Sequence, residues 1–105
     1  MKNLNEDQWV AQIQNDPEAV IIDVRSPLEC EEGIQLGAIQ MNIMNTAQFI
    51  GNIETLYKSK NYYVYCRSGG RSGQACMLMG AKGYNTFNLE GGMLGWTGEV
   101  VVPEK

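Results

Sequence analysis

Histidine is absent from the 105 residues of this chain. Its absence excludes cysteine–histidine dyads, serine–histidine–aspartate triads and the commonest side-chain ligand of transition metals. Cysteine is scarce, because the three cysteines are an odd number, lie far apart and form no Cys-x-x-Cys motif. This usage argues against a disulfide framework, a zinc site and thioredoxin-like redox chemistry, and it predicts a reducing compartment. We therefore expect a function that needs no metal and no cofactor.

Leader sequences and long apolar runs are missing as well. The N-terminal residues turn acidic where a signal peptide would need its apolar region, and no uninterrupted apolar run approaches the length of a membrane span. The net charge of −4 argues against a general nucleic-acid binder. We therefore expect a cytoplasmic protein that binds neither membranes nor nucleic acids. Residues 1–105, with 44% hydrophobic residues, suffice for one compact domain and leave no room for a second.

Acidic residues are missing from one long stretch. Between Thr55 and Leu89 there is no Asp or Glu, and all twelve acidic residues lie outside this stretch. The stretch holds five of the eight basic residues, namely Lys58, Lys60, Arg67, Arg71 and Lys82. Charge varies along any protein surface, so chance alone can produce such a stretch. Its centring on Cys66 favours instead an anion-attracting site that would stabilise a thiolate.

Apolar runs alternate with segments of helical spacing. Strands are predicted at 19–24, 61–65 and 85–89, with a further short strand between Ala38 and Met44. Helices are predicted at 5–14, from Thr46 to Tyr57, and from Arg71 or Ser72 to 82, with a short helix that opens at Ser26-Pro27. The helix from Thr46 is expected to place Tyr57 on its apolar side. This alternation predicts an α/β fold with a small, mainly parallel sheet flanked by helices.

The most informative segment runs from Tyr62 to Ser72 and reads Tyr-Tyr-Val-Tyr-Cys-Arg-Ser-Gly-Gly-Arg-Ser. The order predicts a strand, a tight loop and a helix start, which places Cys66 where ligands bind in parallel sheets. Gly69 and Gly70 permit backbone conformations closed to other residues, so that successive N–H groups can face one point. Together with the positive end of the helix dipole, these donors would hold Cys66 as a nucleophilic thiolate.

The spacing within this loop separates sulfur chemistry from phosphate chemistry. Arg67 and Arg71 suit the oxyanion part of a substrate, because a guanidinium group matches a planar pair of oxygens. Cysteine-dependent phosphatases and arsenate reductases use the pattern Cys-x5-Arg-Ser/Thr. Here four residues separate Cys66 from Arg71, and Ser72 stands where the phosphatase arginine would be. The smaller ring of donors suits one sulfur atom better than a tetrahedral phosphate, which makes phosphatase the less favoured alternative.

In these motifs the chain resembles the single-domain rhodaneses, a family of sulfurtransferases. The similarity covers about residues 20–96 and rests on Asp23-Val24-Arg25, residues 33–39, residues 66–72, and Leu89-Glu90-Gly91-Gly92 with Trp96. It implies a rhodanese-like fold and ping-pong transfer of a sulfane sulfur from thiosulfate or a persulfide donor to cyanide or a thiol. It implies that Cys66 forms the persulfide. It further implies that the substrate is bound by Arg67, Ser68, Gly69, Gly70, Arg71 and Ser72.

One departure from the family pattern and two alternative roles of rhodanese-like domains bear on the function expected here. Rhodaneses commonly read Gly-His-Ile-Pro-Gly-Ala-x-Asn-Ile-Pro where this chain has residues 33–42, and here the histidine and both prolines are absent. Some rhodanese-like domains are non-catalytic binding modules, although those often lose the cysteine that this chain keeps. A persulfide carrier that passes sulfur to a protein acceptor needs the same loop as a free-standing enzyme.

The remaining polar and aromatic candidates are given supporting roles. Asp23 and Arg25 follow a predicted strand and are interpreted as an internal ion pair that fixes the loop, in preference to a catalytic acid and an anion binder. Four further residues are interpreted as core residues, namely Trp9, Cys30, Cys76 and Trp96. Gly91 and Gly92 are expected to form a tight turn.

Overall fold

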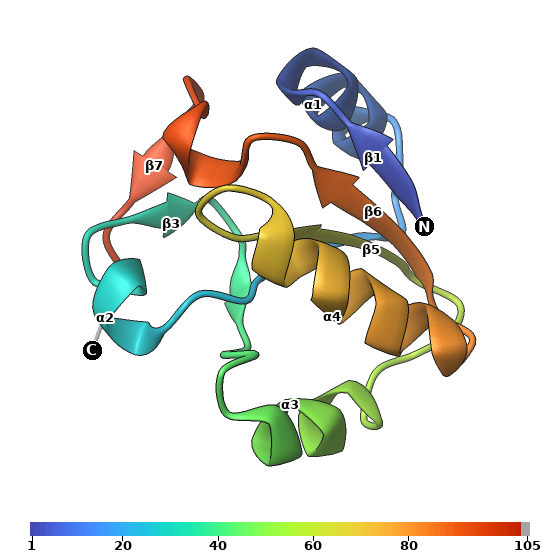
Figure 1. The fold of residues 1–105 in the computed structure, drawn as a ribbon. Helices are drawn as coiled ribbons and strands as arrows, with labels where there is room; N and C mark the ends of the chain where they lie inside the picture. Colours follow the sequence, from blue (N-terminus) through green and yellow to red (C-terminus); the bar gives the residue numbers. More distant parts are fainter. Residues whose placement is uncertain (104–105) are drawn as a thin grey trace.

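The computed structural model describes residues 1–103 and contains a central sheet of five parallel strands in the order β1-β6-β5-β2-β4 (Figure 1). These strands are β1 (Lys2–Leu4), β2 (Ala19–Asp23), β4 (Ile39–Gln40), β5 (Asn61–Tyr65) and β6 (Asn85–Leu89). A separate antiparallel pair joins β3 (Ile34–Gln35) to β7 (Val100–Val101). The expected α/β fold with a mainly parallel sheet is confirmed.

Helices cover both faces of the sheet. They are α1 (Glu6–Gln14), α2 (Pro27–Cys30), α3 (Thr46–Ile53), α4 (Gly70–Ala81) and the 3-10 helix η1 (Gly92–Leu94). The side chains of α3 and α4 pack on one face, whereas Trp9 of α1 packs on the other face with Met93 and Trp96. Within residues 1–103, no helix is long and apolar enough to cross a membrane.

Strand β5 lies in the middle of the sheet and contributes to both halves of the core. Tyr62 and Val64 face α3 and α4, and Tyr63 and Tyr65 face α1, because alternate side chains of a strand point to opposite faces. All four side chains are buried. Burial on both faces explains why this strand is a continuous apolar and aromatic run. The strand ends in this rigid setting directly before Cys66.

One prediction about the connecting segments needs correction. Helix α3 ends at Ile53, and Tyr57 beyond it is 72% exposed, so it is not on a buried helix face. The chain leaves the helix because Thr55 N–H and Leu56 N–H donate to carbonyls only three residues back, which tightens the last turn. The short strand predicted between Ala38 and Met44 is confirmed as β4, which consists of two residues, Ile39 and Gln40.

Strands β1, β3 and β7 are absent from the sequence prediction. They contain three, two and two residues. Such short elements carry no readable alternation, and only pairing with a distant strand defines them. Strand β1 pairs with β6, whose residues lie at the other end of the chain.

Candidate active site

Cys66 lies directly after β5, at the carboxyl end of the central strand, and only 1% of it is exposed. Its Sγ accepts a hydrogen bond from Gly69 N–H at 3.0 Å, and the Ser72 hydroxyl lies 3.3 Å away. Gly69 precedes α4 with a φ of 107°, in the left-handed region that favours glycine. The glycine therefore allows the chain to turn back so that an N–H group points at the sulfur.

These donors determine the acidity of the thiol. Burial raises the pKa of the Cys66 thiol, but hydrogen bonds from the Ser72 side chain and from the backbone of Ser72, Gly69 and Ser68 lower it more. The net result is a pKa below the ordinary value of 9.0. A larger fraction of Cys66 is therefore thiolate at neutral pH, without any histidine.

Replacing Ser72 with alanine is expected to raise the pKa of the Cys66 thiol, because it removes a side-chain donor and keeps the backbone donors. A hydrogen bond to a charged group contributes about 1.5–3 kcal/mol, which corresponds to about 10- to 150-fold. Because Asn88 Oδ1 and the Gly69 carbonyl compete for the Ser72 proton, alkylation by iodoacetamide at neutral pH should slow by about tenfold, the lower end of this range. The pH dependence of the alkylation rate measures this change. Ser68→Ala is the matched control, because the Ser68 side chain is exposed and its contribution comes from the backbone. An equal shift in both variants would refute the role of the Ser72 hydroxyl.

Asn88 is a site residue that the sequence did not reveal. The Ser72 hydroxyl is fully buried, and its oxygen lies 2.5 Å from Asn88 Oδ1 and 3.2 Å from the Gly69 carbonyl. Asn88 Nδ2 in turn donates to Asn3 Oδ1 at 3.0 Å. The single hydroxyl proton is shared between these acceptors and Cys66 Sγ, and the contacts hold the hydroxyl beside the sulfur. The available signal was a polar residue in the middle of a buried strand, which alone does not identify a partner.

The turn at Gly91 and Gly92 supports the Cys66 loop. Met93 N–H donates to the Cys66 carbonyl and Leu94 N–H donates to the Arg67 carbonyl, each at 3.0 Å. A Cβ atom on Gly92 would lie 2.5 Å from the Cys66 carbonyl oxygen, so only glycine allows this approach. The glycine pair thus forms the expected tight turn, and it fixes the backbone on both sides of the Cys66–Arg67 peptide bond.

Asp23 and Arg25 form the internal ion pair that was favoured over a catalytic role. Asp23 is fully buried and Arg25 is 7% exposed, and Arg25 Nη2 lies 2.7 Å from Asp23 Oδ2. The same nitrogen donates to the Gly33 carbonyl at 2.7 Å. Asp23 lies beside Tyr65 in the sheet, one residue before the cysteine. The pair therefore supports the site from the neighbouring strand.

The stretch 33–42, which lacks the histidine and prolines of the family pattern, is held by other contacts. Arg25 binds its first carbonyl, and Gln35 N–H donates to the Tyr65 hydroxyl at 3.0 Å. Gln35 Oε1 also accepts from Trp9 Nε1 at 3.0 Å. Pairing of β3 with β7 adds backbone bonds. These contacts from β5, α1 and β7 fix the backbone here without the missing prolines.

The two loop arginines differ in their surroundings. Arg67 is exposed and forms no ion pair with residues 1–103. Arg71 is paired with Glu29, a contact that the acid-free stretch between Thr55 and Leu89 did not lead us to expect. The two residues are 42 positions apart in the sequence, and the fold brings α2 to the start of α4. The surroundings of the cysteine are therefore less positive than the local sequence suggests.

The other cysteines are poor nucleophiles. Cys30 and Cys76 are buried and free. Burial raises the pKa of Cys30 to about 12 and that of Cys76 to about 11. Both remain thiols at neutral pH, in agreement with the packing role expected for them. No group of three or more His, Cys, Asp or Glu within the described residues could hold a metal ion.

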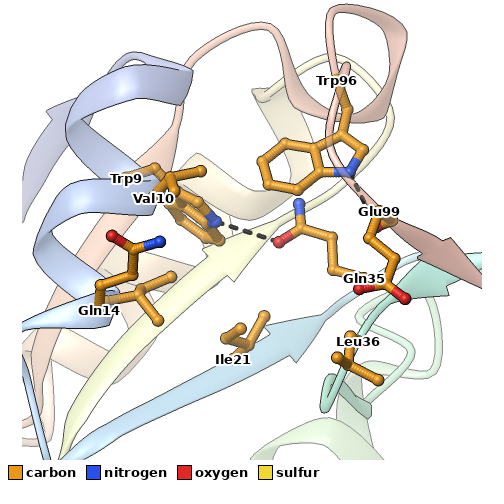
Figure 2. A pocket seen from close by; sticks show the side chains of 9 residues that line it. Trp9, Val10, Gln14, Ile21, Gln35, Leu36, Trp96 and Glu99 are labelled. Carbon is orange, nitrogen blue, oxygen red and sulfur yellow. Dashed lines mark hydrogen bonds between the residues drawn. The ribbon is translucent and has the colours of Figure 1, made fainter.

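An apolar hollow of about 140 Å³ lies away from the cysteine, between α1 and the segment around Trp96 (Figure 2). Trp9 is buried in its wall, as expected, and Trp96 is half-buried with its Nε1 donating to the Glu99 carbonyl. The residues that line this hollow include no cysteine and no basic side chain. The reactive sulfur and the arginines lie elsewhere, so we place the candidate site at the Cys66 loop.

Comparison with known proteins identifies relatives of this chain. A family model described as the rhodanese-like domain matches residues 6–99, a range that contains the Cys66 loop. The Bacillus subtilis (strain 168) protein named "Putative sulfurtransferase YtwF" is 39% identical over 87 residues, which cover 83% of this chain and 82% of that protein. An Allochromatium vinosum protein named sulfurtransferase is 32% identical over 91 residues, which cover 83% and 82%.

Solved structures of rhodanese-like proteins have the same fold as this chain. The crystal structure of a rhodanese-like domain protein from Staphylococcus aureus has a TM-score of 0.85 against this structure at 26% identity. The superposition covers 99% of this chain and 100% of the other. The similarity therefore includes every element that positions the site.

Proposed function

This chain belongs to the rhodanese-like domain family, and we propose that it is a sulfurtransferase that carries sulfur as a persulfide on Cys66. The donor would be thiosulfate or a persulfide, and the acceptor cyanide, a small thiol or a protein thiol. The observation that carries the proposal is the hydrogen bond that Gly69 N–H donates to Cys66 Sγ at 3.0 Å, with the Ser72 hydroxyl also within reach of the sulfur at 3.3 Å. The three free cysteines support a cytoplasmic location, where thiols stay reduced.

The proposed reaction has two displacement steps at sulfur. The Cys66 thiolate attacks the outer sulfur of thiosulfate, the sulfur–sulfur bond of the donor breaks, and sulfite leaves with the bonding electron pair. The product is a persulfide anion on Cys66. Cyanide then attacks the outer sulfur of this persulfide, thiocyanate leaves, and the thiolate returns. Charge is conserved in both steps and no proton is transferred, which suits a site without histidine.

The loop donors would stabilise both the thiolate and the persulfide anion of Cys66. The N–H of Gly69 faces the thiolate at 3.0 Å, and Ser68 and Ser72 also donate from the backbone. A persulfide anion extends the negative charge by one atom toward the same donors. Losing one preorganised donor of this kind typically costs about 3–4 kcal/mol of transition-state stabilisation. The four-residue spacing between Cys66 and Arg71 keeps this ring small, as one sulfur atom requires.

Incubation with thiosulfate followed by intact mass measurement tests the proposal. We expect the protein to gain the mass of one sulfur atom and to lose it to cyanide, with release of thiocyanate. Cys66→Ser should gain nothing. Cys76→Ala is the matched control and should load fully, because its raised thiol pKa keeps Cys76 unreactive.

The outcomes also separate the alternatives. No sulfur gain together with hydrolysis of an aryl phosphate would favour a cysteine-dependent phosphatase. Neither activity would favour a non-catalytic binding module. Sulfur gain with slow discharge by cyanide and rapid discharge by a protein thiol would identify a sulfur carrier that acts on a protein partner.

A further inference from the structure

Arg71 does not present a free charge to the site. Its Nη1 donates to Glu29 Oε1 at 2.6 Å, and its Nη2 donates to Glu29 Oε2 at 2.8 Å. Both ends of the guanidinium fork are therefore bound to one carboxylate, which is the strongest geometry for such a pair. An oxyanion that is to bind the Nη1–Nη2 edge of Arg71 must first displace Glu29, and at any other edge it meets a guanidinium whose charge is already compensated.

Glu29 is itself fixed. Its Oε1 accepts hydrogen bonds from Ser26 N–H at 3.1 Å and from the Ser26 hydroxyl at 3.0 Å, as part of the capping box of α2. Hydrogen bonding to Arg71 lowers the pKa of Glu29 to about 2, so the carboxylate is charged at any physiological pH. About 30% of each side chain is exposed. The pair is thus anchored by α2 and is not a free surface contact.

The charges around the sulfur cancel as a consequence. The Cys66 thiolate and Glu29 are negative, and Arg67 and Arg71 are positive. The neighbouring pair of Asp23 and Arg25 also cancels. Thiosulfate carries two negative charges, and a loop whose net charge is close to zero attracts it weakly.

The rim of the loop also carries apolar groups. Leu94, whose N–H is bonded to the Arg67 carbonyl, is 65% exposed. Leu28, directly before Glu29, is 75% exposed. An exposed leucine whose backbone is bonded to the loop suits a donor with an organic group better than a small inorganic dianion.

We propose that Glu29 is a specificity-determining residue, which disfavours thiosulfate by neutralising Arg71 and favours organic sulfur donors that carry at most one negative charge. This inference rests on the proposed sulfurtransferase function. It deepens that function by naming the class of donor.

Two donors with the same chemistry test the inference. Thiosulfate and methanethiosulfonate each pass their outer sulfur to the Cys66 thiolate, and sulfite or methanesulfinate leaves with the bonding pair. The measured quantity is the ratio of the loading rate constants, thiosulfate over methanethiosulfonate, at low ionic strength. In Glu29→Gln, which keeps an acceptor for Ser26, this ratio should rise about tenfold, because one negative charge beside the site is removed.

Glu31→Gln is the matched control. It removes the same charge from the exposed end of α2, where Glu31 forms no ion pair with the described residues, and it should leave the ratio unchanged. Arg71→Met is the opposite test. It leaves Glu29 uncompensated and should lower the ratio, and it remains informative if Glu29→Gln folds poorly.

An unchanged ratio in Glu29→Gln, or an equal rise in Glu31→Gln, would overturn the inference and leave the sulfurtransferase proposal intact. Failure of both donors to load Cys66 in the unmodified protein would overturn both proposals. A ratio that rises only in Glu29→Gln and falls in Arg71→Met would support the inference.

Discussion

Replacing Gly92 with alanine should lower the free energy of unfolding by about 2–5 kcal/mol and remove sulfur loading. The added Cβ atom would lie 2.5 Å from the Cys66 carbonyl oxygen and 2.6 Å from the Arg67 carbonyl carbon. Both neighbours are backbone atoms, so no side chain can rotate away. Relief requires the Cys66 loop to move, and the hydrogen bonds from Met93 and Leu94 to its carbonyls would then break.

Gly91→Ala provides the matched control for this effect. Both glycines have a positive φ, 77° at Gly91 and 52° at Gly92, but a Cβ atom on Gly91 would meet no atom within 4 Å. Alanine at Gly91 should therefore cost only the conformational penalty of about 1–2 kcal/mol and retain loading. Urea unfolding and thiosulfate loading measure the two quantities. Equal losses in both variants would show that contact with the Cys66 loop is not the cause.

The fold was predictable where the sequence pattern is local. The continuous apolar run of β5 and the glycines around it indicated a buried strand, a turn and a helix, and the structure has them in that order. Parallel pairing followed from the alternation of strands and helices. The short strands β1, β3 and β7 were not predictable, because pairing across the chain defines them and no periodic pattern does.

The candidate site, like the fold, was predictable only where its residues lie close together in the sequence. Cys66 and Gly69 could be identified because they belong to one short sequence motif, and their hydrogen bond joins residues only three positions apart. The partners that tune the loop are remote: Asn88 approaches Ser72 from 16 positions away, and Glu29 approaches Arg71 from 42. An acid-free stretch in the sequence therefore gives the wrong local charge when another element supplies a carboxylate.

Asp23→Asn is expected to lower the free energy of unfolding by about 3–5 kcal/mol, because it leaves the charge of Arg25 buried without its partner. Asparagine has nearly the same shape, so lost packing contributes little. Arg25 would keep its bond to the Gly33 carbonyl, but the carboxylate that holds three of its donors would be gone. Since Asp23 lies beside Tyr65 in the sheet, the loss should also slow sulfur loading at the neighbouring Cys66.

A surface ion pair provides the comparison with the buried pair of Asp23 and Arg25. Lys60 and Glu18 lie 2.6 Å apart, but their side chains are 38% and 47% exposed, and Glu18→Gln should leave the stability unchanged within error. Chemical unfolding of Asp23→Asn, Glu18→Gln, Arg25→Met and the double variant Asp23→Asn/Arg25→Met measures these changes in stability. The double variant should lose less than the sum of its single changes, because neither charge is then left unpaired. A small loss in Asp23→Asn, like that in Glu18→Gln, would mean that water reaches Arg25 and that the pair does not support the Cys66 loop.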